Sequence, residues 1–185
     1  MAQGHLYRLQ RTVVLVGMMG SGKTAIGRAL ACRLHTPFVD SDAAIEEAAA
    51  LSVPEIFARD GEAFFRKREA EVLRRLLSGP PGIVSTGGGA FLSEANRDAI
   101  AQMGVAVWLD ADLATLWERV RHKDTRPLLR TADPKATLTD IFNARTPIYR
   151  LAGLQINVNE HASIDQTTQS VIDTLATRPD ILETL

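Results

Sequence analysis

The sequence predicts an α/β fold in which a parallel five-stranded sheet carries helices on both faces. Short apolar segments of strand character alternate along the chain with segments of helical periodicity, which is typical of such sheets. A glycine-rich turn follows the first strand, and polar or glycine-rich residues follow two others. Because ligands bind beyond the carboxyl ends of parallel strands, we expect these three strand ends to form one crevice.

The composition is typical of a soluble globular protein, with 45% hydrophobic and 23% charged residues. A net charge of −1 and 5% aromatic residues offer neither a basic surface nor a stacking platform for nucleic acid. No segment is expected to span a membrane. The single cysteine, Cys32, precludes an internal disulfide and is expected to be buried in the first helix. We therefore expect one domain over residues 1–185, a cytoplasmic monomer without a nucleic-acid or membrane partner.

The first strand is expected at residues 12–16, and the first helix begins near Lys23. Between them, residues 17–24 read GMMGSGKT, the pattern of a phosphate-binding loop. Its glycines let successive backbone N–H groups turn inward, and the helix start adds its positive dipole end. Lys23 supplies charge for the outer phosphates, and the Thr24 hydroxyl can ligate Mg²⁺. The segment predicts a nucleoside triphosphate site.

The second strand, at residues 37–39, ends in Asp40-Ser41-Asp42. In extended backbone two carboxylates at this spacing point to the same side. Beside a phosphate site, one could hold Mg²⁺ through water while the other orients a substrate hydroxyl. Alternatively, Ser41 or Asp42 simply caps the next helix.

The remaining segments continue the alternation of helix and strand, after a polar extension at residues 1–11. In order they are a helical region at 43–77 interrupted near 52–54 and 60–61, a strand at 83–85, a helix capped by Ser93, a strand at 105–109, helices at 113–121 and 134–145, a strand at 154–158 and a closing helix that contains Ile164, Val171, Ile172 and Leu175.

Two strand ends leave their interpretation open. Three glycines, Gly87 to Gly89, follow the third strand and offer unobstructed N–H groups to hydroxyls or an anion, although a flexible turn has the same composition. The fourth strand ends in Asp110, the usual form of the magnesium carboxylate in phosphate-loop NTPases. From the residues alone, Asp110 and Asp40 are equal candidates for the metal.

Two basic segments are also ambiguous. Arg66 shares its helix with other cations and with Glu62 and Glu69, a pattern that a solvated, salt-bridged helix face explains well. Residues 119–130 contain five cations and one opposing acid, which fits a lid that closes over phosphates, a solvated loop or a patch for a polyanion.

Further along, the chain carries four motifs in a fixed order: Phe57-x-x-x-Gly61-Glu62-x-x-Phe65-Arg66-x-x-Glu69, Ser85-Thr86-Gly87-Gly88-Gly89, Arg126-Pro127-Leu128-Leu129 and Arg145-x-Pro147-x-Tyr149. With the phosphate loop and the Asp40-Ser41-Asp42 segment they resemble the shikimate kinase family over residues 12–149. The resemblance implies the fold of nucleoside monophosphate kinases with strand order 2-3-1-4-5, a helical substrate-binding region at about 41–78 and a lid at about 121–134. It also implies Mg²⁺-dependent transfer of the ATP γ-phosphoryl group to the 3-hydroxyl of shikimate, in aromatic amino-acid biosynthesis.

The resemblance further assigns individual residues. Lys23, Asp42 and Arg126 are the catalytic candidates, with Asp42 as the base. Thr24 and Asp40 are the metal candidates, and Asp110 is then structural, as a helix cap. The nucleotide-binding candidates are Gly20, Ser21, Gly22, Lys23, Thr24, Ala25, Arg119 and Arg126. The shikimate-binding candidates are Asp42, Arg66, Gly87, Gly88, Gly89 and Arg145, and residues 157–163 should border the adenine.

Three rival functions remain. A kinase for gluconate or a nucleoside monophosphate would use the same arginine pair, since a guanidinium fork suits a carboxylate or a phosphate. A GTPase switch or assembly ATPase is disfavoured because the chain lacks an Asn-Lys-x-Asp motif. An inactive, binding-only relative is disfavoured because every motif position holds a residue capable of its task.

Overall fold

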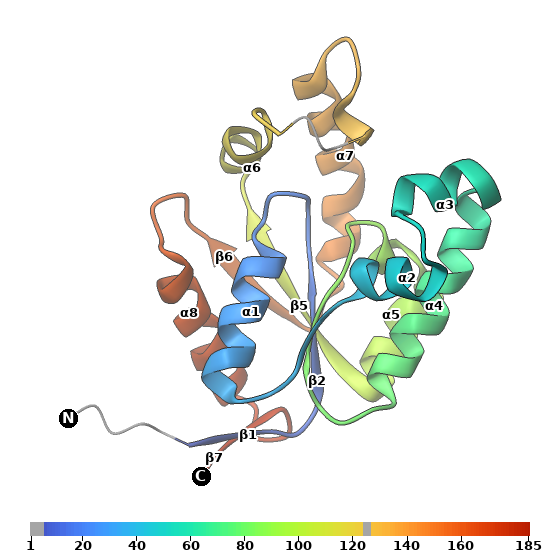
Figure 1. Ribbon diagram of the computed structural model, residues 1–185. Coiled ribbons are helices and arrows are strands. Elements are labelled where there is room, and N and C mark those ends of the chain that lie inside the picture. The colour runs from blue at the N-terminus through green and yellow to red at the C-terminus, as the bar shows by residue number, and fades with distance from the viewer. Residues whose placement is uncertain (1–5, 124–126) are drawn as a thin grey trace.

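The computed structural model describes residues 6–123 and 127–185. Its centre is a five-stranded sheet of order β3-β4-β2-β5-β6 in which every neighbouring pair is parallel (Figure 1). The strands are β2 Thr12–Val16, β3 Phe38–Asp40, β4 Ile83–Ser85, β5 Gly104–Ala111 and β6 Leu154–Val158. This is the expected order 2-3-1-4-5, renumbered because a short strand precedes the sheet. The predicted fold class is confirmed.

Helices cover both faces of the sheet. In Figure 1, α1 and α8 lie on one side of it and α4 and α5 on the other. The helices are α1 Lys23–Leu34, α2 Ser41–Ala49, α3 Val53–Asp60, α4 Glu62–Leu77, α5 Glu94–Met103, α6 Leu113–Val120, α7 Pro134–Tyr149 and α8 Ile164–Ala176, with 3₁₀ turns η1 Ala90–Leu92 and η2 Pro127–Leu129. No helix among these described residues is long and apolar enough to cross a membrane.

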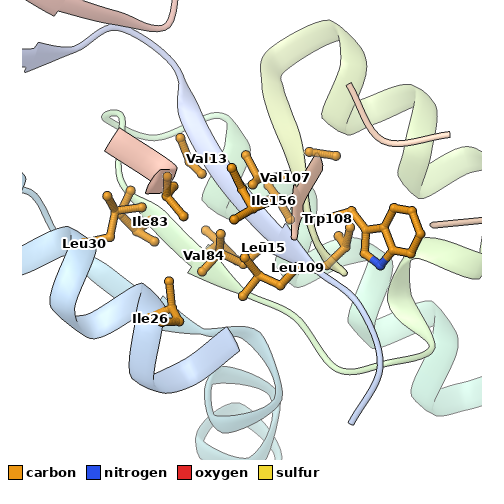
Figure 2. Packing of buried hydrophobic residues seen from close by; sticks show 14 of the residues in the cluster. Val13, Leu15, Ile26, Leu30, Ile83, Val84, Val107, Trp108, Leu109 and Ile156 are labelled. Carbon is orange, nitrogen blue, oxygen red and sulfur yellow. The ribbon is translucent and has the colours of Figure 1, made fainter. Parts of the chain in front are cut away.

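The core is built around the central strand. All five residues of β2 are buried, as both faces of a parallel strand must be when helices cover them. In Figure 2, side chains of β2 and β4 meet Ile26 and Leu30 from α1, while Trp108 extends from β5 on the other side of the group. This tight packing fixes the ends of β2, β3 and β4, where the candidate site residues begin.

Helices α2 to α4 form a region with its own hydrophobic cluster, centred on Ile45, Ile56, Phe65 and Val72. Local chemistry produces the two predicted interruptions. Ser52 and Glu55 form a capping box that starts α3. Gly61, at φ 85°, lies in the left-handed half of the backbone map and separates α3 from α4. The interruptions near 52–54 and 60–61 are confirmed.

Three expectations are wrong in part. Residues 7–9 are not a mere extension, because β1 (Tyr7–Leu9) pairs antiparallel with β7 (Leu182–Thr184), a contact between chain ends that no local pattern announces. Helix α7 continues past Arg145 to Tyr149 and contains Pro147. A proline inside a helix removes one backbone hydrogen-bond donor, and here packing against neighbouring elements keeps the helix intact. Cys32 is exposed, since it lies on the outer face of α1.

Candidate active site

The loop between β2 and α1 has the backbone of a phosphate cradle. Gly20 (φ 81°) and Gly22 (φ 96°) adopt left-handed conformations that side chains resist, and Gly22 caps α1 without a side-chain hydrogen bond. The first-turn N–H groups of α1 therefore face the loop, where an anion can meet them. The Lys23 ammonium donates hydrogen bonds to the carbonyls of Gly17 and Met18, at 2.8 and 2.9 Å, so the loop itself holds this charge in place.

Helix α6 supports the loop from outside. The Arg119 guanidinium donates a hydrogen bond to the carbonyl of Gly20 at 3.1 Å. A Cβ at Gly20 would lie 2.8 Å from Cγ1 of Val120, so only glycine fits at this contact. Arg119 thus both braces the loop and stands at the edge of the crevice that the loop lines.

The three strand ends converge as expected. A cavity of about 620 Å³ lies beyond the carboxyl ends of β2, β3 and β4. Its walls are the phosphate loop, the start of α2, the turn after β4, and apolar residues between β6 and α8. The residues that line it are Met19, Gly20, Ser21, Gly22, Lys23, Thr24, Ala25, Ile26, Asp40, Asp42, Thr86, Gly87, Gly88, Arg119, Lys123, Val158, Ala162, Ile164 and Thr167. Residues 157–163, expected to border a base, contribute two of these.

Asp40 and Asp42 reach the cavity by a different geometry from the one expected. Helix α2 begins at Ser41, so the backbone is not extended through Asp42. Asp40 is the N-cap, and its Oδ1 accepts a hydrogen bond from the N–H of Ala43 at 3.1 Å. Asp42 lies in the first helical turn. The alternative that Ser41 or Asp42 caps the helix is also wrong, because Asp40 has that position.

Hard oxygen atoms suited to Mg²⁺ meet where α1 and α2 begin. The Thr24 hydroxyl lies 3.4 Å from Oδ2 of Asp40, and both residues line the cavity. Over the described ranges, no group of three or more His, Cys, Asp or Glu side chains could hold a metal alone. Mg²⁺ commonly binds through one or two protein side chains and takes its other ligands from water and substrate phosphates.

Asp110 is placed differently from Asp40. Its Oδ2 accepts a hydrogen bond from Gln155 Nε2 at 2.7 Å, and it is not among the described residues that line the cavity. The expectation that Asp110 caps the following helix is wrong. Asp112 caps α6, through a hydrogen bond of 2.7 Å from the N–H of Thr115.

Asp42 is a half-buried carboxylate whose pKa is affected by both burial and neighbouring charges. Burial raises its pKa most, and the charge of Asp40 adds to this, whereas Lys23 and Arg66 oppose it. Its Oδ1 is buried and has no hydrogen-bond partner within the described chain. A carboxylate with a raised pKa at the edge of a phosphate site is well suited to accept a proton.

The three glycines after β4 are the point where the candidate acceptor residues meet. A Cβ at Gly87 would lie 2.7 Å from an Asp42 carboxylate oxygen, one at Gly88 2.8 Å from an Arg145 guanidinium nitrogen, and one at Gly89 2.5 Å from an Arg66 nitrogen. None of the three has a positive φ. A side chain at any of these positions would have to displace one of these charged groups, so glycine serves here for close approach and not for backbone conformation.

Side chains from three distant helices therefore close around one short backbone segment. Asp42 comes from α2, Arg66 from α4 and Arg145 from α7. Arg66 and Arg145 do not line the main cavity themselves but adjoin it through Asp42 and Gly88. The arrangement places a carboxylate and two guanidinium groups around the glycines at the edge of the cavity that the phosphate loop lines, and we call this group the acceptor pocket.

Comparison with known proteins decides the family. The family model for shikimate kinase matches residues 19–176. The chain belongs to the shikimate kinase family. It is 63% identical to the shikimate kinase of Ruegeria pomeroyi over 95% of this chain and 90% of the relative, and 57% identical to that of Cereibacter sphaeroides over 96% and 88%.

Solved structures agree with this assignment. Shikimate kinase from Acinetobacter baumannii, in complex with shikimate, superposes with a TM-score of 0.83 at 36% identity over 91% of this chain and 94% of that one. A gluconokinase from Sinorhizobium meliloti, at 18% identity and a TM-score of 0.62, shares the fold alone. The prediction of a shikimate kinase with the fold of this family is confirmed.

Within this shikimate kinase site, Arg66 lies only partly on a solvated helix face: its side chain is 35% exposed, and its Nε lies 3.6 Å from a carboxylate oxygen of the exposed Glu62. Its Nη1 donates hydrogen bonds of 2.9 and 3.1 Å to both carboxylate oxygens of Glu69, which is almost fully buried. Burial raises the pKa of Glu69, and Arg66 opposes that rise. Arg68, in contrast, pairs with Glu71 where both side chains are about half exposed. The surface interpretation holds for Arg68. For Arg66 it holds in part, because the pairs with Glu62 and Glu69 both form but Glu69 is buried.

Glu69 and Tyr149 belong to the family motifs, but the sequence assigns neither of them a role in the site. Glu69 could have been found because it lies four residues after Phe65 and three before Val72, on the buried stripe of α4, where an acid needs a partner. Tyr149 is fully buried and donates a hydrogen bond of 2.6 Å to the carbonyl of Gly88. No periodic signal identifies it, because its contact is with a distant turn.

Part of the segment expected to act as a lid lies within the described residues. Lys123 lines the cavity, and η2 follows with Leu129 packed into the core. Arg126, a catalytic and nucleotide-binding candidate, lies outside the described residues, and its role stays a prediction.

Proposed function

We propose that this chain transfers the γ-phosphoryl group of ATP to the 3-hydroxyl of shikimate, giving shikimate 3-phosphate and ADP. The observation that carries the proposal is the junction at Asp42, which lines the cavity together with Lys23 of the phosphate loop and approaches Gly87, two residues before the glycine that Arg66 approaches. The relative crystallised in complex with shikimate supports the choice of acceptor. We also propose that the chain acts as a single-domain monomer in the cytoplasm.

The nucleotide is held mainly by backbone. The N–H groups from Gly20 to Ala25 bind the phosphates, and Lys23 offsets charge on the outer ones. Arg119 lies along the nucleotide, opposite the apolar wall made by Val158, Ala162 and Ile164. These contacts recognise a triphosphate and a flat base.

Thr24 and Asp40 are the residues that would hold Mg²⁺. When bound, the ion neutralises charge on the phosphate oxygens and helps to align them. The 3.4 Å contact between the two side chains, together with the engagement of Asp110 by Gln155, supports Asp40 over Asp110 for this role.

The acceptor is bound by charge and by backbone. Arg66 and Arg145 bind the carboxylate of shikimate, and the N–H groups of Gly87 to Gly89 bind its hydroxyls. Asp42 orients the 3-hydroxyl. The 3-oxygen forms a bond to the γ-phosphorus as the bond from that phosphorus to the β–γ bridging oxygen breaks, and Asp42 accepts the hydroxyl proton late in this step.

Arg126 is proposed to reach the transferring phosphoryl group as the lid closes and excludes water. Arg126→Ala should lower kcat by about 10²–10³, as expected when one preorganised electrostatic donor is lost. Steady-state kinetics measures this, and a change smaller than about threefold would remove Arg126 from the mechanism.

A coupled ADP-release assay with ATP–Mg²⁺ tests the function. Shikimate, gluconate and nucleoside monophosphates are compared as acceptors at equal concentrations, with ATP alone as the background. We expect turnover above background with shikimate only, and a product whose phosphate is on the 3-oxygen by ³¹P and ¹H NMR. Faster turnover with gluconate or a nucleoside monophosphate would overturn the proposal.

A further inference from the structure

Tyr149 places a hydroxyl group at a fixed point behind the acceptor pocket. It is the last residue of α7, and its side chain is fully buried. Its ring stacks on Trp108 of β5, with ring centroids 6.3 Å apart, and Trp108 is seen in Figure 2. The central sheet therefore fixes the ring, and the hydroxyl donates its hydrogen bond of 2.6 Å to the carbonyl of Gly88.

The carbonyls of the three glycines are held in two different ways. Those of Gly87 and Gly89 accept hydrogen bonds from the N–H groups of Ala90 and Leu92, at 3.2 and 3.1 Å, within the local turn. The carbonyl of Gly88 is held by Tyr149, 61 residues away in the sequence. Among the described residues, Tyr149 is thus the long-range anchor of this segment.

That anchor controls a peptide plane. The carbonyl of Gly88 and the N–H of Gly89 belong to one planar, trans unit, so holding the first fixes the direction of the second. Consecutive glycines have more conformational freedom than any other backbone, and such a plane rotates easily when it is not held. Within the part of the chain that the structure describes, no group accepts a hydrogen bond from the N–H of Gly89.

The same helix presents a guanidinium group to this peptide. Arg145 lies four residues before Tyr149, on the same face of α7. A Cβ at Gly88 would lie 2.8 Å from Arg145 Nη1 and 3.6 Å from the Tyr149 hydroxyl. Moving this peptide would therefore disturb both the N–H of Gly89 and the place of Arg145.

We propose that Tyr149 is a positioning residue for the acceptor: its hydroxyl holds the Gly88–Gly89 peptide so that the glycine N–H groups and Arg145 together bind shikimate. The inference rests on the proposed function, because it concerns the same pocket. It predicts an effect confined to the acceptor, since the phosphate loop has its own supports in Lys23 and Arg119.

Tyr149→Phe tests the hydroxyl while keeping the ring against Trp108. We expect KM for shikimate to rise about tenfold, the factor that corresponds to about 1.4 kcal/mol, with a smaller fall in kcat. KM for ATP should change by no more than about twofold, which is less than the change expected from the loss of one hydrogen bond. Thr146→Val is the matched control, because it removes another α7 hydroxyl, bonded to the Phe142 carbonyl, away from the glycines. It should leave both KM values unchanged.

Circular dichroism and thermal unfolding of each variant accompany the kinetics. The proposal would be overturned by equal changes in both KM values or by an unchanged KM for shikimate. It would also be overturned if the Tyr149→Phe chain did not fold, because the hydroxyl would then stabilise the fold as a whole. Failure of the wild-type chain to phosphorylate shikimate would instead overturn the proposed function, and the same assay distinguishes the two.

Discussion

The two halves of the site both depend on glycines, but for different reasons. In the phosphate loop, Gly20 and Gly22 have φ values of 81° and 96°, so the backbone conformation itself requires glycine. After β4, none of the three glycines has a positive φ, and their role is to leave room for Asp42, Arg145 and Arg66, which a Cβ would displace. The phosphate loop depends on a particular backbone conformation, whereas the acceptor pocket depends on side chains that gather around a glycine-rich backbone segment.

This difference explains how each half can be recognised. The loop is complete within eight consecutive residues, so its chemistry can be inferred from spacing alone. The acceptor pocket takes one side chain from each of α2, α4 and α7. It exists only in the folded chain, and substitutions in it should affect one substrate and spare the other.

The largest effect is expected at the junction of the halves. Asp42→Asn should lower kcat by about 10²–10⁴, the range for a lost general base. Since burial and the charge of Asp40 raise the pKa of Asp42, activity of the wild-type enzyme should fall in acid at a pH above the usual aspartate range. A pH–rate profile measures this, with Glu47→Gln, the same change on the exposed face of α2, as the control.

The same variant should be more stable than the wild type at neutral pH. A raised pKa in the folded state means that the ionised Asp42 costs stability above that pKa, and that the cost disappears below the pKa of the unfolded chain. The gain in Tm from Asp42→Asn should therefore shrink as the pH is lowered. A loss of stability at neutral pH, or nearly full activity, would contradict the role of Asp42.

A crossed pair of glycine variants tests the comparison directly. Gly20→Ala should impair ATP binding, because alanine at φ 81° is strained and its Cβ would meet Val120. Gly89→Ala should instead displace the Arg66 guanidinium and lower kcat/KM for shikimate about 10²-fold, the effect of a misplacement of about 1 Å. Isothermal titration with each substrate separates the two effects.

Gly61→Ala is the control for this pair. Gly61 also has a positive φ, of 85°, but a Cβ there would meet no atom within 4 Å. It should lower Tm through backbone strain and leave the binding of both substrates intact. If Gly20→Ala and Gly89→Ala weakened both substrates alike, the two halves would not be independent.

Arg66→Ala and Arg145→Ala should raise KM for shikimate by about 10- to 100-fold, as expected for lost hydrogen bonds to a charged group. Nucleotide affinity should be nearly unchanged, because neither residue lines the main cavity. Arg68→Ala is the matched control on α4, since Arg68 pairs with Glu71 in solvent. Equal loss of affinity for ATP and shikimate would count against the two arginines as acceptor ligands.

The sequence predicts local features well because their causes are local. The strand–loop–helix unit at residues 12–34 follows from apolar periodicity and glycine spacing, and the start of α3 follows from the capping box of Ser52. Strand β1 cannot be predicted in this way, because three residues carry no periodic signal and its partner is at the other end of the chain. The predicted end of α7 near Arg145 is four residues too early, and the structure shows that the helix continues through Pro147.

The acceptor pocket could be named only through the family resemblance. Spacing gives no reason to separate Arg66 from the other cations of α4, because what distinguishes it is the burial of Glu69 and the approach of Gly89. The sequence pattern also does not identify Asp40 as the N-cap of α2. The extended backbone expected through residues 40–42 would place Asp42 differently from the first helical turn in which it lies. The burial of Glu69 follows from the apolar stripe of α4, but the approach of Arg66 to Gly89 is a tertiary contact that no local rule contains.

The smallest expected effect is at Asp110, the carboxylate that sequence alone could not separate from Asp40. Asp110→Asn should leave the Mg²⁺ concentration for half-maximal activity unchanged, because this side chain accepts from Gln155 and does not line the cavity. It should cost at most about 1 kcal/mol of stability, the usual worth of one hydrogen bond. Asp40→Asn should raise the Mg²⁺ requirement, since its oxygen lies beside the Thr24 hydroxyl. A magnesium titration of both variants decides, and the reverse result would move the metal to the end of β5 and separate it from the loop that binds the phosphates.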